Sequence, residues 1–125
     1  MTKKILIIGG VAGGASTATR LRRLDENAEI VMFERGQYIS FANCGLPYHI
    51  SGVIGSRDAL IVQSVEEMKN KFNIDVRINT SVEKINRKEK TVKAKNLDTN
   101  EVYEESYDLI VISTGSQPIK PPITG

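Results

Sequence analysis

The residues best suited to chemistry are a cluster of glycines, one glutamate and the single cysteine. Four glycines within residues 9–14 follow the apolar residues 5–8, and Glu34 ends a second apolar segment. Glycine lets the backbone turn tightly, and the N-terminus of a following helix offers unpaired N–H groups to a pyrophosphate. A carboxylate about 20 residues later accepts hydrogen bonds from ribose hydroxyls. The order of strand, glycines, helix, strand and acid favours a dinucleotide site over a plain strand–turn–helix.

The glycine spacing departs from the dinucleotide pattern G-x-G-x-x-G at one position. Gly9 and Gly14 occupy its first and third glycine positions, but Val11 occupies the second, where glycine normally leaves room for the pyrophosphate. Gly10 and Gly13 are available to compensate. We therefore expect a binding site with shifted contacts.

Cys44 lies on a loop, residues 38–52, on the side of the sheet where a bound cofactor would lie. Pro47 suits the first turn of a helix, and a cysteine just before a helix N-terminus is favoured as a thiolate. Two interpretations stay open, a reactive thiol and an inert packing residue. His49 has no neighbours that could complete a metal site, so we expect a packed or surface histidine and no bound metal.

The composition is that of an ordinary globular protein. The chain has 125 residues, of which 40% are hydrophobic and 26% charged, enough for one compact domain. The net charge of +2 is too small to indicate binding to nucleic acid or to a membrane surface. No apolar run is long enough to span a bilayer, and the N-terminus lacks the pattern of a signal peptide. With one cysteine and no internal disulfide, we expect a cytoplasmic protein.

Hydrophobic periodicity predicts an α/β fold of the Rossmann type, with helices flanking a parallel sheet and an antiparallel β-meander. A helix is expected over about residues 13–25, and Ser64 with Glu67 predicts a capping box at the start of a second helix. The parallel strands are expected near residues 4–8, 30–34, 74–78 and 109–112. The meander is expected near residues 82–86, 91–95 and 101–107.

One face of the first helix is basic. Ser16, Arg20 and Arg23 stand at positions i, i+4 and i+7, so their side chains share this face. Such a face is either solvated or grips a second anionic ligand, and the sequence spacing alone leaves both interpretations open.

Four motifs together resemble the FAD domain of the single-cysteine pyridine nucleotide–disulfide oxidoreductases, and the resemblance covers essentially the whole chain. They are residues 9–14 (Gly-Gly-Val-Ala-Gly-Gly), 33–35 (Phe-Glu-Arg), 40–48 (Ser-Phe-Ala-Asn-Cys-Gly-Leu-Pro-Tyr) and 113–115 (Ser-Thr-Gly). The Ser-Phe-Ala-Asn-Cys segment is the specific one. It most resembles coenzyme A-disulfide reductases, including those fused to a rhodanese domain.

The resemblance implies a role for each motif. The glycine loop would hold the FAD pyrophosphate, Glu34 with Arg35 would bind the adenosine ribose, and Cys44 would face the flavin as the catalytic residue. The implied cofactor-binding residues are Gly9, Gly10, Val11, Ala12, Gly13, Glu34, Arg35, Asn43, Val82, Thr114 and Gly115. The implied residues for binding coenzyme A are Ser16, Arg20, Arg23, Ser40, Asn43 and Lys71.

Two departures narrow the choice within this family. Relatives with two cysteines place the second one five positions after the first, where this chain has His49, so Cys44 would pair with an external thiol or cycle through a sulfenate. Relatives that act as NADH peroxidases or oxidases carry a histidine in the glycine loop, where this chain has Ala12.

The expected activity is therefore FAD-dependent reduction of coenzyme A disulfide, or of a related disulfide or persulfide, by NADH or NADPH. An NADH oxidase or peroxidase is one alternative, and a non-catalytic nucleotide-binding domain is the other. The resemblance also implies that residues 1–125 are the N-terminal part of a longer, homodimeric protein whose NADH domain and dimerisation domain lie outside this chain.

Overall fold

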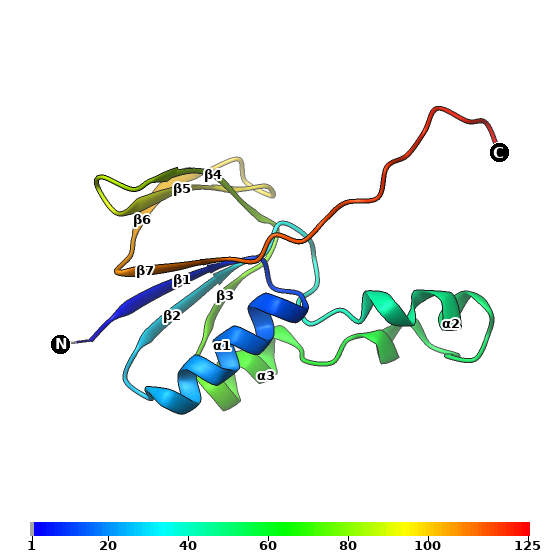
Figure 1. Ribbon diagram of the computed structural model, residues 1–125, viewed down its shortest axis with the longest axis horizontal. Helices are drawn as coiled ribbons and strands as arrows, with labels where there is room; N and C mark the ends of the chain where they lie inside the picture. The colour runs from blue at the N-terminus through cyan, green and yellow to red at the C-terminus, as the bar shows by residue number, and fades with distance from the viewer. Residues whose placement is uncertain (1) are drawn as a thin grey trace.

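The computed structural model describes residues 2–125 and contains two sheets (Figure 1). The parallel sheet has the strand order β3-β2-β1-β7, with β1 Lys4–Ile8, β2 Glu29–Phe33, β3 Asp75–Arg77 and β7 Leu109–Ile112. The antiparallel meander consists of β4 Thr80–Asn86, β5 Thr91–Asn96 and β6 Val102–Ser106. The helices are α1 Ala12–Leu24, α2 Leu46–Ile50 and α3 Val65–Phe72, with short 3-10 turns η1 Asn43–Gly45 and η2 Arg57–Leu60.

The predicted α/β architecture is confirmed, and β1 is a central strand of the parallel sheet. Ile8 pairs with Phe33 of β2 on one side and with Ile112 of β7 on the other. The strand predicted at residues 74–78 is shorter, because Asn79 adopts a left-handed conformation (φ 49°) that turns the chain toward the meander. All four strands of the sheet run parallel, so their carboxyl ends lie at one edge.

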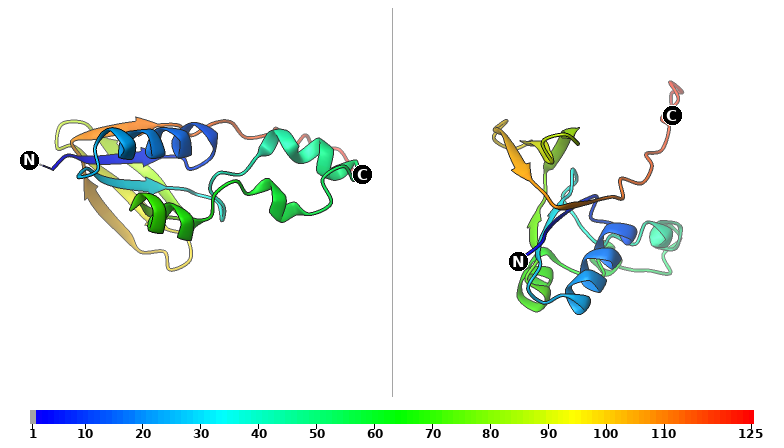
Figure 2. Two further views of the ribbon diagram at one scale, coloured as in Figure 1. Left: turned by 90° about the horizontal axis from the view of Figure 1, so that it is seen from below. Right: turned by 60° about the vertical axis from the view of Figure 1, so that its left-hand side comes forward.

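Alternation along β1 divides the core into two layers. Ile5 and Ile7 pack with α1 and α3 on one face of the parallel sheet, and Leu6 packs with the meander on the other. Figure 2 shows the helices and the meander on opposite sides of the sheet. Since both faces of the strand are covered, β1 reads as a continuous apolar run.

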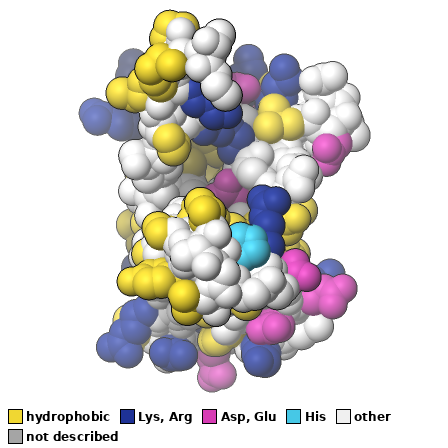
Figure 3. Space-filling view, turned by 90° about the vertical axis from the view of Figure 1, so that its right-hand side faces the viewer, with side chains coloured by type: hydrophobic (Ala, Val, Ile, Leu, Met, Phe, Trp, Pro, Cys, Tyr) yellow, Lys and Arg dark blue, Asp and Glu magenta, His cyan; other side chains and the backbone are white. Residues whose placement is uncertain are grey.

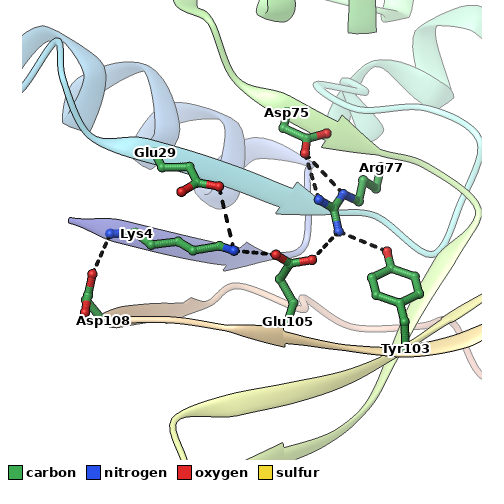
Figure 4. A network of polar contacts seen from close by, with 7 residues as sticks. All are labelled: Lys4, Glu29, Asp75, Arg77, Tyr103, Glu105 and Asp108. Carbon is green, nitrogen blue, oxygen red and sulfur yellow. Dashed lines mark hydrogen bonds and ion pairs between the residues drawn. The ribbon is translucent and has the colours of Figure 1, made fainter. Parts of the chain in front are cut away.

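A network of charged side chains joins the meander to the parallel sheet (Figure 4). Glu105 of β6 pairs with Lys4 of β1 and, at 2.7 Å, with Arg77 of β3, whose guanidinium also pairs with Asp75 at 2.8 Å. Burial alone would raise the pKa of Glu105, but hydrogen bonds from Lys4 and Arg77 outweigh it and lower this pKa. The pKa of Arg77 is raised, because its hydrogen bonds to Asp75, Glu105 and Tyr103 outweigh burial.

Arg22 fixes the end of α1 against the end of α3. Its Nε donates to the carbonyl oxygen of Phe72 at 2.7 Å, and another guanidinium nitrogen donates to that of Asn73 at 3.0 Å. At the other end of α3, the Ser64 hydroxyl accepts from the N–H of Glu67 at 3.1 Å, which confirms Ser64 as the N-cap. The return bond from the Glu67 side chain, which would complete the predicted capping box, is not formed within residues 2–125. The helices within residues 2–125 are too short to cross a membrane.

Residues 41–62 form an arm that projects beyond the end of the sheet (Figures 1 and 2). Its two ends meet in an antiparallel bridge between Phe41 and Ile61, and the N–H of Ala42 donates to the carbonyl oxygen of Leu60 at 2.7 Å. The arm carries η1, α2 and η2. It is therefore a closed loop that is anchored at its base.

Candidate functional site

The glycine loop lies against the end of β7. Gly9 has a φ of 103°, and a Cβ atom at this position would lie 2.0 Å from the carbonyl oxygen of Ser113. A Cβ atom at Gly14 would lie 1.7 Å from the carbonyl oxygen of Gly9. Both positions therefore require glycine, and the resulting close contact places the first turn of α1 beside the carboxyl ends of β1 and β7.

The N-terminus of α1 is open to a ligand. The helix begins at Ala12 with Val11 as its N-cap, and within residues 2–125 no side chain caps it. Ala12 and Gly13 are exposed. Because the first N–H groups of a helix have no partner within the helix, this turn can bind the oxygens of a pyrophosphate.

Glu34 supports the glycine loop from the end of β2. Its Oε1 accepts from the N–H of Gly10 at 3.0 Å, and its Oε2 accepts from the N–H of Gly36 at 2.6 Å. Gly10 is buried, and a Cβ atom there would lie 2.7 Å from a methyl carbon of Ile39. The N–H of Gly10 is thus bound to the Glu34 carboxylate and its Cα packs against the core, whereas Gly13 lies on the exposed side of the loop.

A cavity of about 160 Å³ opens at the carboxyl ends of the parallel strands, and we name it the strand-end cavity. Its lining residues are Ile8, Gly9, Phe33, Glu34, Arg35, Thr80, Ser81, Val82 and Thr114. The structure therefore brings together Gly9, Glu34, Arg35, Val82 and Thr114, five of the predicted cofactor residues, from segments far apart in the chain. Gly115 follows with a φ of 67° and lies outside this lining.

A second cavity of about 160 Å³ is lined by residues of α1 and α3 and of the segments at the base of the arm, and we name it the helix-face cavity. Its lining residues are Ala15, Ser16, Thr19, Arg23, Ser40, Val62, Gln63, Met68 and Phe72. Three predicted substrate residues, Ser16, Arg23 and Ser40, thus meet in one place. An open groove joins Arg23 to Lys71, while Arg20 is exposed and lies outside both linings.

Ser40 connects the glycine loop to the arm. Its N–H donates to the carbonyl oxygen of Gly10 at 2.7 Å, and its carbonyl oxygen accepts from the N–H of Val62 at 3.0 Å. Ser40 is 8% exposed and has a φ of 50°, a left-handed conformation that is uncommon for serine. Residues held in such conformations concentrate at binding and catalytic sites.

Cys44 and Asn43 lie on the arm, outside the linings of both cavities. Cys44 is exposed and occupies the middle of η1, whereas the sequence predicts a position just before a helix. The helix α2 begins two residues later, and Pro47 lies in its first turn as expected. Within residues 2–125 the Cys44 thiol is therefore not buried, and its reactivity stays a prediction.

His49 is partly buried, in line with the packed or surface histidine that the sequence predicts. Its Nδ1 lies 2.9 Å from the carbonyl oxygen of Ile54, within the arm. Figure 3 shows this histidine in cyan at the surface, on the face of the molecule that the arm forms. Residues 2–125 contain no group of three or more His, Cys, Asp or Glu side chains that could hold a metal ion.

Sequence reasoning missed several residues that line the two cavities. Thr80 and Ser81 line the strand-end cavity at the start of β4, and Thr19 and Gln63 line the helix-face cavity. Their local sequences carry no motif, so only the packing of separate segments reveals them. Arg22, next to the predicted Arg23, proves to be a structural clamp.

The comparison with known proteins identifies the family. A family model described as pyridine nucleotide-disulphide oxidoreductase matches residues 3–125. The chain belongs to this family. Pyridine nucleotide-disulphide oxidoreductases use FAD and NAD(P)H. The glycine loop and the open N-terminus of α1 are suited to the pyrophosphate of FAD, and the carboxylate of Glu34 is suited to its ribose. The residues present therefore fit this cofactor.

Individual members of the family resemble the chain closely over a limited part of their length. Coenzyme A disulfide reductase of Staphylococcus haemolyticus is 42% identical over 114 residues, which cover 91% of this chain and 26% of that protein. Reduced Bacillus anthracis CoADR-RHD is 58% identical with a TM-score of 0.93, over 98% of this chain and 22% of that one. An NAD-dependent persulfide reductase from A. fulgidus is 40% identical with a TM-score of 0.89, over 96% of this chain and 22% of that one. The chain spans about a quarter of the length of these relatives.

Proposed function

We propose that residues 1–125 are the FAD-binding part of an enzyme that reduces coenzyme A disulfide, or a related disulfide or persulfide, with NADH or NADPH through Cys44. The observation that carries this proposal is the position of Ser40. This residue lines the helix-face cavity, is hydrogen-bonded to the glycine loop, and holds the base of the arm that bears Cys44. The relatives named as disulfide and persulfide reductases support the same reaction class.

The two ends of FAD require different residues. Glu34 would accept from the ribose hydroxyls, and the N–H groups of Ala12 and Gly13 would bind the pyrophosphate. Val82 would meet the adenine through its backbone, and Thr114 would border the cofactor from the end of β7. When bound, FAD carries two electrons from the nicotinamide to the disulfide.

The substrate would lie along the basic face of α1. Arg23 and Lys71 flank one groove, and Arg20 lies on the same helix face, so these cations would bind the phosphates of coenzyme A. Ser16 and Ser40 would line the path of the pantetheine chain. Asn43 would contact the end of this chain beside Cys44.

Cys44 would act as the nucleophile. Its thiolate Sγ attacks one sulfur of the substrate, the S–S bond of the substrate breaks, and one coenzyme A leaves as a thiolate. A mixed disulfide remains on Cys44. Two electrons then cleave this bond, which restores the Cys44 thiolate and releases the second coenzyme A thiolate, and solvent protonates both released thiolates.

The test uses the full-length protein and its Cys44→Ser variant. The variant is expected to keep its flavin and to lose disulfide reductase activity, because serine cannot form the mixed disulfide. Intact-mass measurement of oxidised wild type is expected to show a coenzyme A adduct that a reductant removes. If no adduct forms and the variant turns over normally, Cys44 is not the redox centre. Oxygen consumption without any disulfide would instead favour the NADH oxidase, against which Ala12 argues.

A further inference from the structure

Gln63 has an unusual hydrogen-bonding state. Its Oε1 is buried and has no hydrogen-bond partner. Within residues 2–125 it is the one buried side-chain nitrogen or oxygen atom without such a partner. Native proteins pair nearly all such atoms, because a buried acceptor without a donor has lost its water and gained nothing. An unpaired acceptor at this place therefore needs an explanation.

Gln63 lies at the junction of the arm with α3, between Val62 and the N-cap Ser64, and it lines the helix-face cavity. Rotation about the last bond of its side chain exchanges the amide oxygen with the amide nitrogen. A donor group of a ligand in the cavity would supply the missing partner once the amide turns its oxygen toward that group.

The neighbours of Gln63 define which donor fits. Arg23 lines the same cavity, so a cationic donor such as an ammonium group is disfavoured there. The hydroxyl of Thr19 already donates to the carbonyl oxygen of Ser16 at 3.1 Å. The remaining wall combines the hydroxyls of Ser16 and Ser40 with apolar side chains, which are those of Ala15, Val62, Met68 and Phe72. A neutral N–H group on a chain that has both polar groups and methylenes matches this set.

We propose that Gln63 is a specificity-determining residue whose side-chain carbonyl accepts a hydrogen bond from an amide N–H of the pantetheine chain. The proposal rests on the proposed function, since it assumes that coenzyme A occupies the helix-face cavity. Pantetheine has two amide groups separated by methylenes, and its phosphate end would extend toward Arg23 and Lys71. A disulfide without N–H groups would leave Gln63 unpaired and would gain nothing from it.

The test compares Gln63→Met with a matched control, Gln37→Met, in the full-length enzyme. Methionine keeps the length of the side chain and removes the acceptor, and Gln37 is an exposed glutamine outside both cavity linings. The substrates are coenzyme A disulfide, pantethine, and diethyl disulfide, which has no N–H group. In Gln63→Met, KM for the first two is expected to rise about tenfold with kcat unchanged, while KM for diethyl disulfide stays the same.

A second measurement separates binding from folding. Removing an unpaired buried acceptor is expected to raise the melting temperature of the ligand-free Gln63→Met protein, although its calorimetric affinity for pantetheine falls about tenfold. A purely structural role predicts the opposite, a lower melting temperature and equal effects on all three substrates. Equal pantetheine affinity in wild type and Gln63→Met overturns the proposal. A wild type that binds pantetheine but does not reduce coenzyme A disulfide contradicts the proposed function alone.

Discussion

Replacing Glu34 by glutamine is the sharpest test of the cofactor site, because its carboxylate has two tasks. It holds the glycine loop through the N–H groups of Gly10 and Gly36, and it is the acceptor proposed for the ribose of FAD. In Glu34→Gln one carboxylate oxygen becomes an NH₂ group. This NH₂ group faces the N–H of Gly10 or of Gly36, and because both are donors that hydrogen bond is lost. The remaining bond is made to a neutral amide oxygen in place of a charged carboxylate.

The magnitude follows from these contacts. A hydrogen bond to a charged group contributes about 1.5–3 kcal/mol. Glu34 is half-buried, so the lost bond contributes near the lower end of this range, and the weakening of the second bond brings the loss at the loop to about 2 kcal/mol. This free energy corresponds to about 30-fold in an equilibrium constant. The loss of the charged acceptor for the ribose is about 1.5 kcal/mol, which weakens FAD binding about tenfold.

Two assays on the full-length protein measure the two tasks separately. Hydrogen exchange of the peptides that contain Gly10 and Gly36 is expected to be about 30-fold faster in Glu34→Gln. A fluorescence titration of the apoprotein with FAD gives the change in Kd. Glu89→Gln serves as the control, because Glu89 is exposed in the turn between β4 and β5. An unchanged rate of hydrogen exchange would refute the claim that Glu34 holds the glycine loop. An unchanged Kd for FAD would refute Glu34 as a cofactor ligand.

Two further predictions concern the meander and the arm. Glu105→Gln is expected to lower the melting temperature at neutral pH, by the equivalent of about 2 kcal/mol, because Lys4 and Arg77 lose their shared carboxylate. The pKa of Glu105 is lowered in the fold, so this contribution is present above its ordinary value of 4.5 and is lost as pH falls through the folded pKa. The difference between the melting temperatures should shrink below pH 4.5, and a constant difference would contradict the linkage. For Ser40, with a φ of 50°, Ser40→Gly should be about 1 kcal/mol more stable than Ser40→Ala, and both should lose substrate affinity alike. Equal thermal stability of the two variants would show that no strain is stored there.

The sequence predicts the layers of this fold well, because local patterns determine them. The continuous apolar run of β1 predicts a strand covered on both faces, and the alternation in β5 predicts a half-exposed meander. Other features depend on contacts between distant segments. The register shift in β4 between Val82 and Lys84 has no signal of its own in the sequence. The left-handed conformation of Ser40 likewise follows from its bonds to Gly10 and Val62.

The candidate site divides in the same way. Gly9, Gly14 and Glu34 are predictable because their spacing reflects one local unit of strand, turn and helix. Val82 and Thr114 entered through family resemblance, and the structure supplies the physical reason. Thr114 reaches the strand-end cavity just after β7, which pairs with β1, and Val82 reaches it from β4 of the meander, which contacts β2. Gln63 could not be predicted, since only the three-dimensional packing shows that its carbonyl oxygen lacks a donor.

The central position of β1 has a consequence for how the protein is made. During translation the glycine loop leaves the ribosome early, but the partner of β1 on one side is β7, which is more than a hundred residues further along the chain. Until Leu109–Ile112 has emerged and paired, Ser113 and Thr114 are absent from the wall beside Gly9. Parallel pairing over such a separation is slow compared with the formation of local structure. A nascent chain can therefore form the β1-α1-β2 unit before it can retain a flavin nucleotide, so cofactor loading must wait until β7 has emerged and paired.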